Sequence, residues 1–160
     1  MYYMSRYTTE EKKFTNSDLL PLDVVDSYWL YEENTLNQTN SDGKWMLYYE
    51  KKHFNEKWKL ATCLFREKKL RNVMSMKCST NRINERASST DKGVIILYCN
   101  NSDDRSHIID IGKNISKLFN YQEIIYYKTD KQTTEGTKAT GCTKNHKYYL
   151  KPQYNFIDDD

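Results

Sequence analysis

The sequence lacks any long hydrophobic run. Its 160 residues are 38% hydrophobic and 29% charged, and no stretch approaches the roughly 18 apolar residues that a membrane-spanning helix needs. The first residues also lack the apolar core of a secretory signal peptide. We therefore expect a cytoplasmic protein without a membrane partner.

Cysteine is scarce and widely spaced. The chain has four cysteines and no Cys-x-x-Cys pair, so neither a zinc site nor a disulfide framework is indicated. We expect four reduced, mostly packing thiols in a reducing intracellular compartment, with Cys63 buried beside the apolar face of a helix. The other three are Cys78, Cys99 and Cys142.

The sequence has little that indicates catalysis. Its histidines, His53, His107 and His146, are scattered, and no cluster of Asp, Glu and His has metal-ligand spacing. No glycine-rich phosphate loop or nucleophile elbow is present. We expect no metal, no cofactor, and binding rather than turnover. A metal-independent phosphodiesterase, with a histidine base and lysines that stabilise the transition state, is a less favoured alternative.

Positive charge is concentrated in the middle of the chain. The formal net charge is +3, but residues 1–33 hold three basic and seven acidic side chains, and residues 158–160 are all aspartate. Residues 34–157 hold 22 basic and 12 acidic side chains. A basic body with acidic ends favours an anionic ligand, such as a nucleotide, a nucleic acid or a phosphorylated partner. A solvated lysine-rich surface is the plainer alternative.

The length fits one domain. We expect an N-terminal arm over residues 1–20, a single domain over 21–152 and an acidic tail over 153–160. Runs of β-branched and aromatic residues predict strands near 44–50, 73–79, 93–99 and 124–128. A short turn leading into a strand is expected within 21–31, and a last strand or hairpin within 137–150.

Two amphipathic helices are predicted, over residues 53–67 and 103–119, because apolar residues recur there at helical spacing. Asn55 is the expected N-cap of the first, and Ser102 or Asp103 that of the second. The order of elements predicts an α+β fold, in which a mostly antiparallel sheet carries both helices on one face and leaves the other face for a ligand. The side chains expected in the core are Trp58, Phe65, Ile108, Ile111, Ile115 and Leu118.

Lys44, Lys77 and Lys128 each lie on or beside a predicted strand. A lysine inside a sheet is costly unless its ammonium group reaches solvent or meets an anion. In the strand over 73–79, Lys77 falls on the less apolar side. Gathered on one concave face, the three lysines would form a positive site of the size of a phosphate.

Polar and aromatic residues near these lysines complete the expected ligand site. Asp130 would orient Lys128 or accept a ribose hydroxyl, Thr133 would bond phosphate or cap the turn, and aromatic rings would stack on a base. The alternative is that the rings are core and that Lys128 and Asp130 form a local ion pair. The expected site residues are Lys44, Trp45, Lys77, Tyr126, Lys128, Asp130 and Thr133, with Arg82 and Arg86 in a long polar loop.

Several of these segments resemble one known family in order and spacing. The most specific are Gly43-Lys-Trp45, the strand lysine Lys77 and Tyr127-Lys-x-Asp-x-x-Thr133. They resemble the family of the basophilic-leukaemia-expressed protein, whose fold is like that of the mRNA cap-binding translation initiation factor 4E. The likeness covers roughly residues 28–140. It implies a curved sheet backed by helices and a nucleotide or RNA site, and it implies no established reaction.

Two residues depart from the family pattern. The family usually has proline after the strand lysine, where this chain has Thr129, and an aromatic residue before the threonine, where it has Gln132. We therefore expect a less rigid turn in this chain.

The leading functional prediction is an intracellular binding domain for RNA or a small nucleotide, which it would hold or sequester on the concave face. The alternative is a protein-interaction module, such as a viral or effector protein that engages a host factor through some of its 14 tyrosines. Salt dependence separates the two, because phosphate-led binding weakens steeply with salt.

Overall fold

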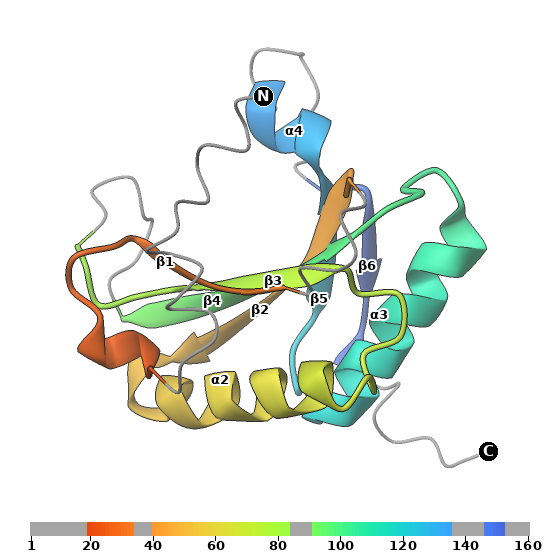
Figure 1. The fold of residues 1–160 in the computed structure, drawn as a ribbon. Helices are drawn as coiled ribbons and strands as arrows, with labels where there is room; N and C mark the ends of the chain where they lie inside the picture. The colour runs from red at the N-terminus through yellow and green to blue at the C-terminus, as the bar shows by residue number, and fades with distance from the viewer. Residues whose placement is uncertain (1–18, 34–39, 84–90, 136–145, 153–160) are drawn as a thin grey trace.

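A computed structural model describes residues 19–33, 40–83, 91–135 and 146–152. These residues form one six-stranded sheet with its long helices on one face (Figure 1). The strand order is β1-β3-β4-β2-β5-β6, and every pairing is antiparallel. The strands are β1 (Trp29–Glu33), β2 (Gly43–Glu50), β3 (Ser75–Ser79), β4 (Lys92–Cys99), β5 (Ile125–Thr129) and β6 (Tyr148–Leu150).

In the described ranges, two long helices and two short ones accompany the sheet. They are α2 (Lys51–Arg66), α3 (Arg105–Phe119), the short α4 (Asp130–Glu135) and the 3-10 helix η2 (Pro21–Asp23). The predicted α+β class, with its antiparallel sheet and two main helices on one face, is confirmed. Residues 1–18 and 153–160, which hold most of the expected arm and tail, lie outside the described residues.

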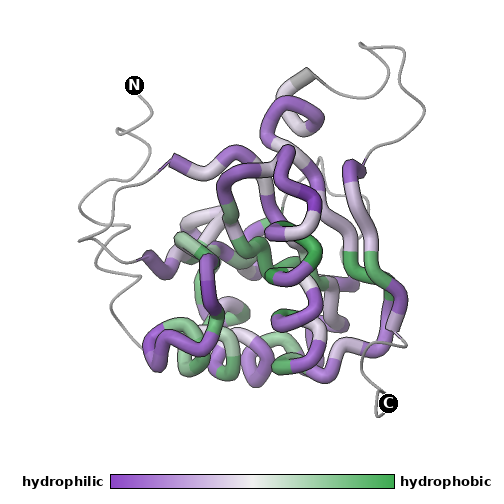
Figure 2. Tube along the Cα trace, turned by 90° about the vertical axis from the view of Figure 1, so that its right-hand side faces the viewer, coloured by the Kyte–Doolittle hydropathy of each residue, from purple (hydrophilic) through white to green (hydrophobic). Residues whose placement is uncertain are grey.

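The core lies between the sheet and the two long helices. In Figure 2 hydrophobic residues gather where the helices meet the sheet, whereas α4 is mostly hydrophilic. Trp45 has no solvent-exposed surface, and its indole packs on Gly112 of α3, where a Cβ atom would overlap the ring. Trp58 is 3% exposed, and the predicted core residues Ile108, Ile111 and Ile115 are also buried.

The first helix differs from its prediction in phase and start. Its buried stripe is Phe54, Trp58, Ala61 and Leu64, so Phe65 and likewise Leu118 of α3 are only partly buried. Cys63 is exposed, not buried, because it falls off this stripe, and its thiol donates to Glu67 at 3.2 Å. The predicted burial of Cys63 is wrong.

The predicted helix caps are also wrong. Because α2 begins at Lys51, Asn55 lies within it, and its side-chain oxygen accepts from the backbone N–H of Leu22 in η2 at 3.1 Å. In α3 the N-cap is Asp104, whose carboxylate accepts from the backbone N–H of His107 at 3.2 Å. None of the described helices is both long and apolar enough to span a membrane.

Candidate functional site

The candidate site is the side of the sheet that faces away from α2 and α3, which we call the open face. Side chains alternate between the two sides of a strand, and directly paired residues share a side. Lys44 is paired with both Tyr98 and Lys128, so these three lie on one side of the sheet. Lys77 is paired with Tyr31 on one neighbouring strand and with Ile96 on the other, and Ile96 is paired in turn with Met46. Met46 is two residues after Lys44 in β2, so Lys77 lies on the same side of the sheet as Lys44.

This register places the three predicted lysines on the open face. Lys44 and Lys128 share a row near one end of the sheet, and Lys77 lies one row further along, two strands away from Lys44. The open face also carries the aromatic residues Trp29, Tyr31, Tyr48, Tyr98, Tyr126 and Tyr149.

Lys77 sits among three of these rings. Its Nζ atom lies 4.0 Å from the centroid of the Trp29 ring, 5.9 Å from that of Tyr31 and 5.8 Å from that of Tyr98. An ammonium within about 6 Å of a ring centroid is attracted to the negative face of the ring. We call Trp29, Tyr31 and Tyr98 the ring cluster. The sequence pattern did not reveal it, because its members come from two strands far apart in the chain.

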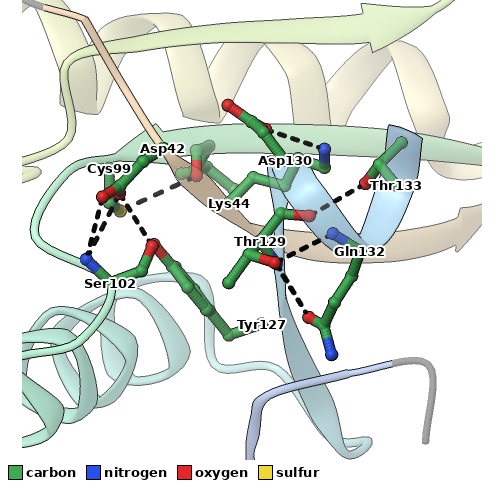
Figure 3. A network of polar contacts seen from close by, with 10 residues as sticks. Asp42, Lys44, Cys99, Ser102, Tyr127, Thr129, Asp130, Gln132 and Thr133 are labelled. Atoms are coloured by element: carbon green, nitrogen blue, oxygen red, sulfur yellow. Dashed lines mark hydrogen bonds and ion pairs between the residues drawn. The ribbon is translucent and has the colours of Figure 1, made fainter. Parts of the chain in front are cut away.

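Lys44 is nearly buried and forms an ion pair with Asp130. The distance from Lys44 Nζ to Asp130 Oδ1 is 3.0 Å, and the side chains are 8% and 42% exposed (Figure 3). Asp130 therefore holds Lys44, not Lys128 as the sequence suggested. The two residues are 86 positions apart in the chain, so proximity in sequence favoured the wrong lysine.

The two departures from the family pattern fix the start of α4. The backbone N–H of Gln132 donates to the Thr129 hydroxyl at 3.0 Å, and the backbone N–H of Thr129 donates to Gln132 Oε1 at 2.9 Å (Figure 3). This is a capping box. The expected loose turn is instead tied by two reciprocal hydrogen bonds. Thr133 donates its hydroxyl to the Thr129 carbonyl at 3.2 Å, and so contributes to the turn.

A buried polar network supports this end of the sheet. Ser102 Oγ lies 2.7 Å from Asp42 Oδ1 and 2.7 Å from the Tyr127 hydroxyl (Figure 3). The backbone carbonyl of Asp42 also accepts from the N–H of Asp130 at 2.9 Å. Burial raises the pKa of Tyr127, and its hydrogen bond with Ser102 offsets part of that rise. A Cβ atom at Gly43 would overlap the Tyr127 hydroxyl, so this network explains the glycine of the Gly-Lys-Trp motif.

Trp45 is removed from the expected ligand site. It lies on the helix side of β2, fully buried, and its Nε1–H donates to the carbonyl of Ile108 at 3.2 Å. Its neighbour Tyr127 also lies on the helix side, with the ring centroids 5.2 Å apart. Strand alternation forces this outcome, because Lys44 and Trp45 are adjacent and must face opposite ways.

Arg82 lies away from the three lysines. It follows the end of β3 at which Ser79 is paired with Trp29. Lys44 and Lys128 lie near the opposite end of the sheet, in the row that contains Tyr98. Its guanidinium stacks 4.4 Å from the centroid of the Tyr28 ring and donates to the carbonyl of Asp26 at 3.1 Å. Arg86 lies outside the described residues.

A second aromatic group lies where β5 meets β6. The ring of Tyr126 is 4.8 Å from that of His146 and 6.3 Å from that of Tyr149. His146 thus contacts a residue of the open face, which its position in the sequence did not indicate.

In the part of the chain that the structure describes, no group of three or more His, Cys, Asp or Glu side chains could hold a metal ion.

Solved structures with a similar fold identify the architecture. A structure of Schistosome eIF4E in complex with m7GpppA and 4E-BP matches with a TM-score of 0.58 and 14% sequence identity, over 93% of this chain and 79% of that one. The corresponding complex with m7GpppG and 4E-BP matches with the same TM-score and coverage and 15% identity. The fold is that of eIF4E.

At this level of identity the likeness shows the eIF4E-like fold alone. No protein-family model matches the chain, and no curated protein matches it either. The predicted fold is therefore confirmed, whereas membership of the basophilic-leukaemia-expressed family stays a prediction. In this eIF4E-like fold, the long helices cover one side of the sheet, and the lysines and the ring cluster lie on the other.

Proposed function

We propose that the protein is a binding domain for an anionic nucleotide-type ligand, either RNA or a small nucleotide, which it holds on the open face. The observation that carries this proposal is the register that aligns Lys44, Lys77 and Lys128 on one side of the sheet. Three ammonium groups with aromatic rings between them suit a phosphate attached to a flat base.

The rigidity of the supporting elements favours binding at this place. Lys44 is held by Asp130, α4 is fixed by its capping box, and the Asp42–Ser102–Tyr127 network ties β2 to β5 and to the start of α3. A site whose side chains are already positioned loses less conformational entropy when the ligand arrives.

The fold also supports the proposal. The two similar structures are complexes of eIF4E with m7GpppA or m7GpppG, so this architecture can hold a nucleotide. We propose that this chain uses it for binding or sequestering the ligand. The described cysteines Cys63, Cys78 and Cys99 are free thiols, which fits the proposed location in a reducing, cytoplasmic compartment.

A protein partner is the second candidate. The two similar structures also hold 4E-BP, and two tyrosines of the open face, Tyr48 and Tyr149, are 45% and 49% exposed. Large exposed aromatic side chains are frequent in protein interfaces. Such an interface would be led by apolar contacts and would depend little on salt.

The test of the proposed function is to identify what copurifies with the protein and then to measure its binding. Mass spectrometry of the small molecules and RNA released by denaturation is expected to find a phosphate-containing ligand. Its affinity is expected to fall with added salt, by about 0.7 in log K per log unit of salt for each phosphate neutralised on a single strand. A salt-independent affinity would favour the protein-interaction alternative. No retained ligand, together with no binding of nucleotides or RNA at low salt, would contradict the proposal.

A further inference from the structure

We infer that a base of the ligand stacks on Tyr149, at the β5–β6 edge of the open face, and that the attached phosphate meets Lys128. This inference rests on the proposed function, because it assigns two parts of the same ligand to places on the open face. Tyr126, His146 and Tyr149 form the aromatic group at this edge, and we call them the edge group.

Tyr149 has the most open ring of the edge group. It is 49% exposed, whereas Tyr126 and His146 are partly buried. The His146 ring meets the Tyr149 ring edge to face, with the centroids 5.7 Å apart and an angle of 82° between the planes. The Tyr126 ring lies 6.3 Å from it. Tyr149 is therefore held by two neighbours and still offers an open surface. A ring that is already positioned can stack on a base of any kind, because every base has a flat face.

No ammonium group has to leave before a base can stack at this edge. In the part of the chain that the structure describes, no lysine or arginine lies over the rings of Tyr126 or Tyr149. By contrast, Lys77 Nζ lies 4.0 Å from the centroid of the Trp29 ring. A base on that face of Trp29 would have to displace the ammonium group and would lose its attraction to the ring. The edge group is therefore the better place for a base than the ring cluster.

Lys128 supplies positive charge beside the edge group. It lies two residues after Tyr126 in β5, on the same side of the sheet and about 7 Å further along the strand. Its side chain is partly exposed, and no described carboxylate forms an ion pair with it. It stands directly opposite Lys44, whose ammonium group is matched by Asp130 at 3.0 Å. Like charges directly opposite each other are unfavourable, so a phosphate beside Lys128 would relieve this repulsion.

The test compares two probes that carry the same phosphates. One is a short single-stranded adenosine oligonucleotide, and the other is an abasic ribose–phosphate oligomer of the same length. Isothermal titration calorimetry at low salt measures both affinities. The wild-type protein is expected to bind the adenosine probe about fivefold to 150-fold more tightly, which is the effect of one stacked base.

Variants of the two residues separate the base from the phosphate. Tyr149→Ala is expected to remove most of the preference, because it weakens the adenosine probe and not the abasic one. Tyr149→Phe, which restores the ring, is expected to restore the preference. Lys128→Ala is expected to weaken both probes by the same factor, because both carry the phosphates.

Tyr48 provides a matched control. It also lies on the open face and is 45% exposed, but it is in β2, four residues beyond Lys44 and away from Lys128. Tyr48→Ala is expected to leave both affinities unchanged. Thermal unfolding followed by circular dichroism shows whether each variant is folded.

Three results would overturn the inference and leave the proposed function standing. The wild-type protein might bind the two probes equally well, the preference might survive in Tyr149→Ala, or Tyr48→Ala might reduce it as much as Tyr149→Ala does. Failure of both probes to bind would also overturn the inference. Only if GTP then fails to bind as well does the proposed function fall with it.

Discussion

Lys44 and Trp45 are adjacent in the chain and lie on opposite sides of the sheet. Trp45 has no exposed surface and packs against α3, whereas Lys44 points to the open face and meets Asp130. The same division runs through β5, where Tyr127 joins the buried network and Lys128 lies on the open face. Single motifs in this chain therefore serve the core and the candidate site at once.

At the scale of single residues, the first prediction concerns the open-face lysines. Lys77→Ala and Lys128→Ala are each expected to weaken binding of a phosphate-containing ligand by about 1–3 kcal/mol, the range for hydrogen bonds to charged groups. The free energy of unfolding should change little for Lys128→Ala, because this side chain is only partly buried. For Lys77→Ala it should fall by about 1 kcal/mol at most, the loss of the cation–π contact with Trp29. Calorimetric titration and urea unfolding measure the two effects.

The control for this prediction is Lys57→Ala, which removes a partly buried lysine from α2. It should leave ligand binding unchanged. If Lys77→Ala and Lys128→Ala lower the stability but not the affinity, the lysines are structural and the ligand binds elsewhere.

The second residue-scale prediction concerns Tyr121. Its hydroxyl accepts from the backbone N–H of Tyr48 at 2.9 Å and donates to the Tyr48 carbonyl at 3.2 Å, where β2 has no β5 partner. Tyr121→Phe leaves both backbone groups without these hydrogen bonds. It is expected to lower the free energy of unfolding by about 1–3 kcal/mol near neutral pH. Tyr28→Phe, which changes an exposed tyrosine, serves as the control.

Tyr121 also predicts a pH dependence. Burial raises its pKa to about 12, whereas a tyrosine in the unfolded chain titrates near pH 10. The contribution of Tyr121 to stability is therefore complete below about pH 10 and is lost as the pH rises toward about 12. The stability difference between the wild type and Tyr121→Phe should shrink across this window. A difference that stays constant would contradict this assignment.

At the scale of elements, the helices were predictable and their ends were not. The apolar spacing around Trp58 and Ile111 predicted both long helices, because burial of a stripe against a sheet leaves a period in the sequence. Helix starts depend on single side chains, and Asp104 was one of several acceptors near the start of α3. The short helix α4 has no apolar stripe and left no such period.

The capping box of α4 gives the third prediction. Gln132→Ala removes the bond to the Thr129 N–H and is expected to cost the helix about 1 kcal/mol. Hydrogen exchange of the amides in residues 130–135 should become faster. Thr134→Ala, an exposed change in the same helix, should not have this effect. Unchanged exchange in Gln132→Ala would mean that other interactions hold α4.

The fourth prediction concerns the packing of α2. Trp58 is 3% exposed and lies in the core cluster. Trp58→Ala is expected to lower the free energy of unfolding by about 3–5 kcal/mol, as for a large aromatic removed from a core. Phe65→Ala, a partly buried residue of the same helix, should cost less. Denaturant unfolding measures both, and a smaller effect than that of Phe65→Ala would contradict the packing described here.

At the scale of the whole molecule, the fold was predictable because six strands and two helices leave strong patterns. The candidate site was only partly predictable from the sequence. The sides of Lys77 and Lys128 follow from alternation, whereas the partner of Asp130, the ring cluster and the Asp42–Ser102–Tyr127 network join distant parts of the chain. A single sequence does not encode such pairings in any local pattern, so the structure was needed to find them.

The central claim is that the ligand binds the open face and not the helices. Backbone amide shifts in two-dimensional NMR test it most directly, with GTP or a short single-stranded RNA added to the full, isotope-labelled chain. We predict that the shifts concentrate at Lys44, Lys77, Tyr98, Tyr126 and Lys128, and that Lys77→Ala reduces them at a given ligand concentration. Shifts confined to α2 and α3, or no shifts with either probe, would contradict the claim.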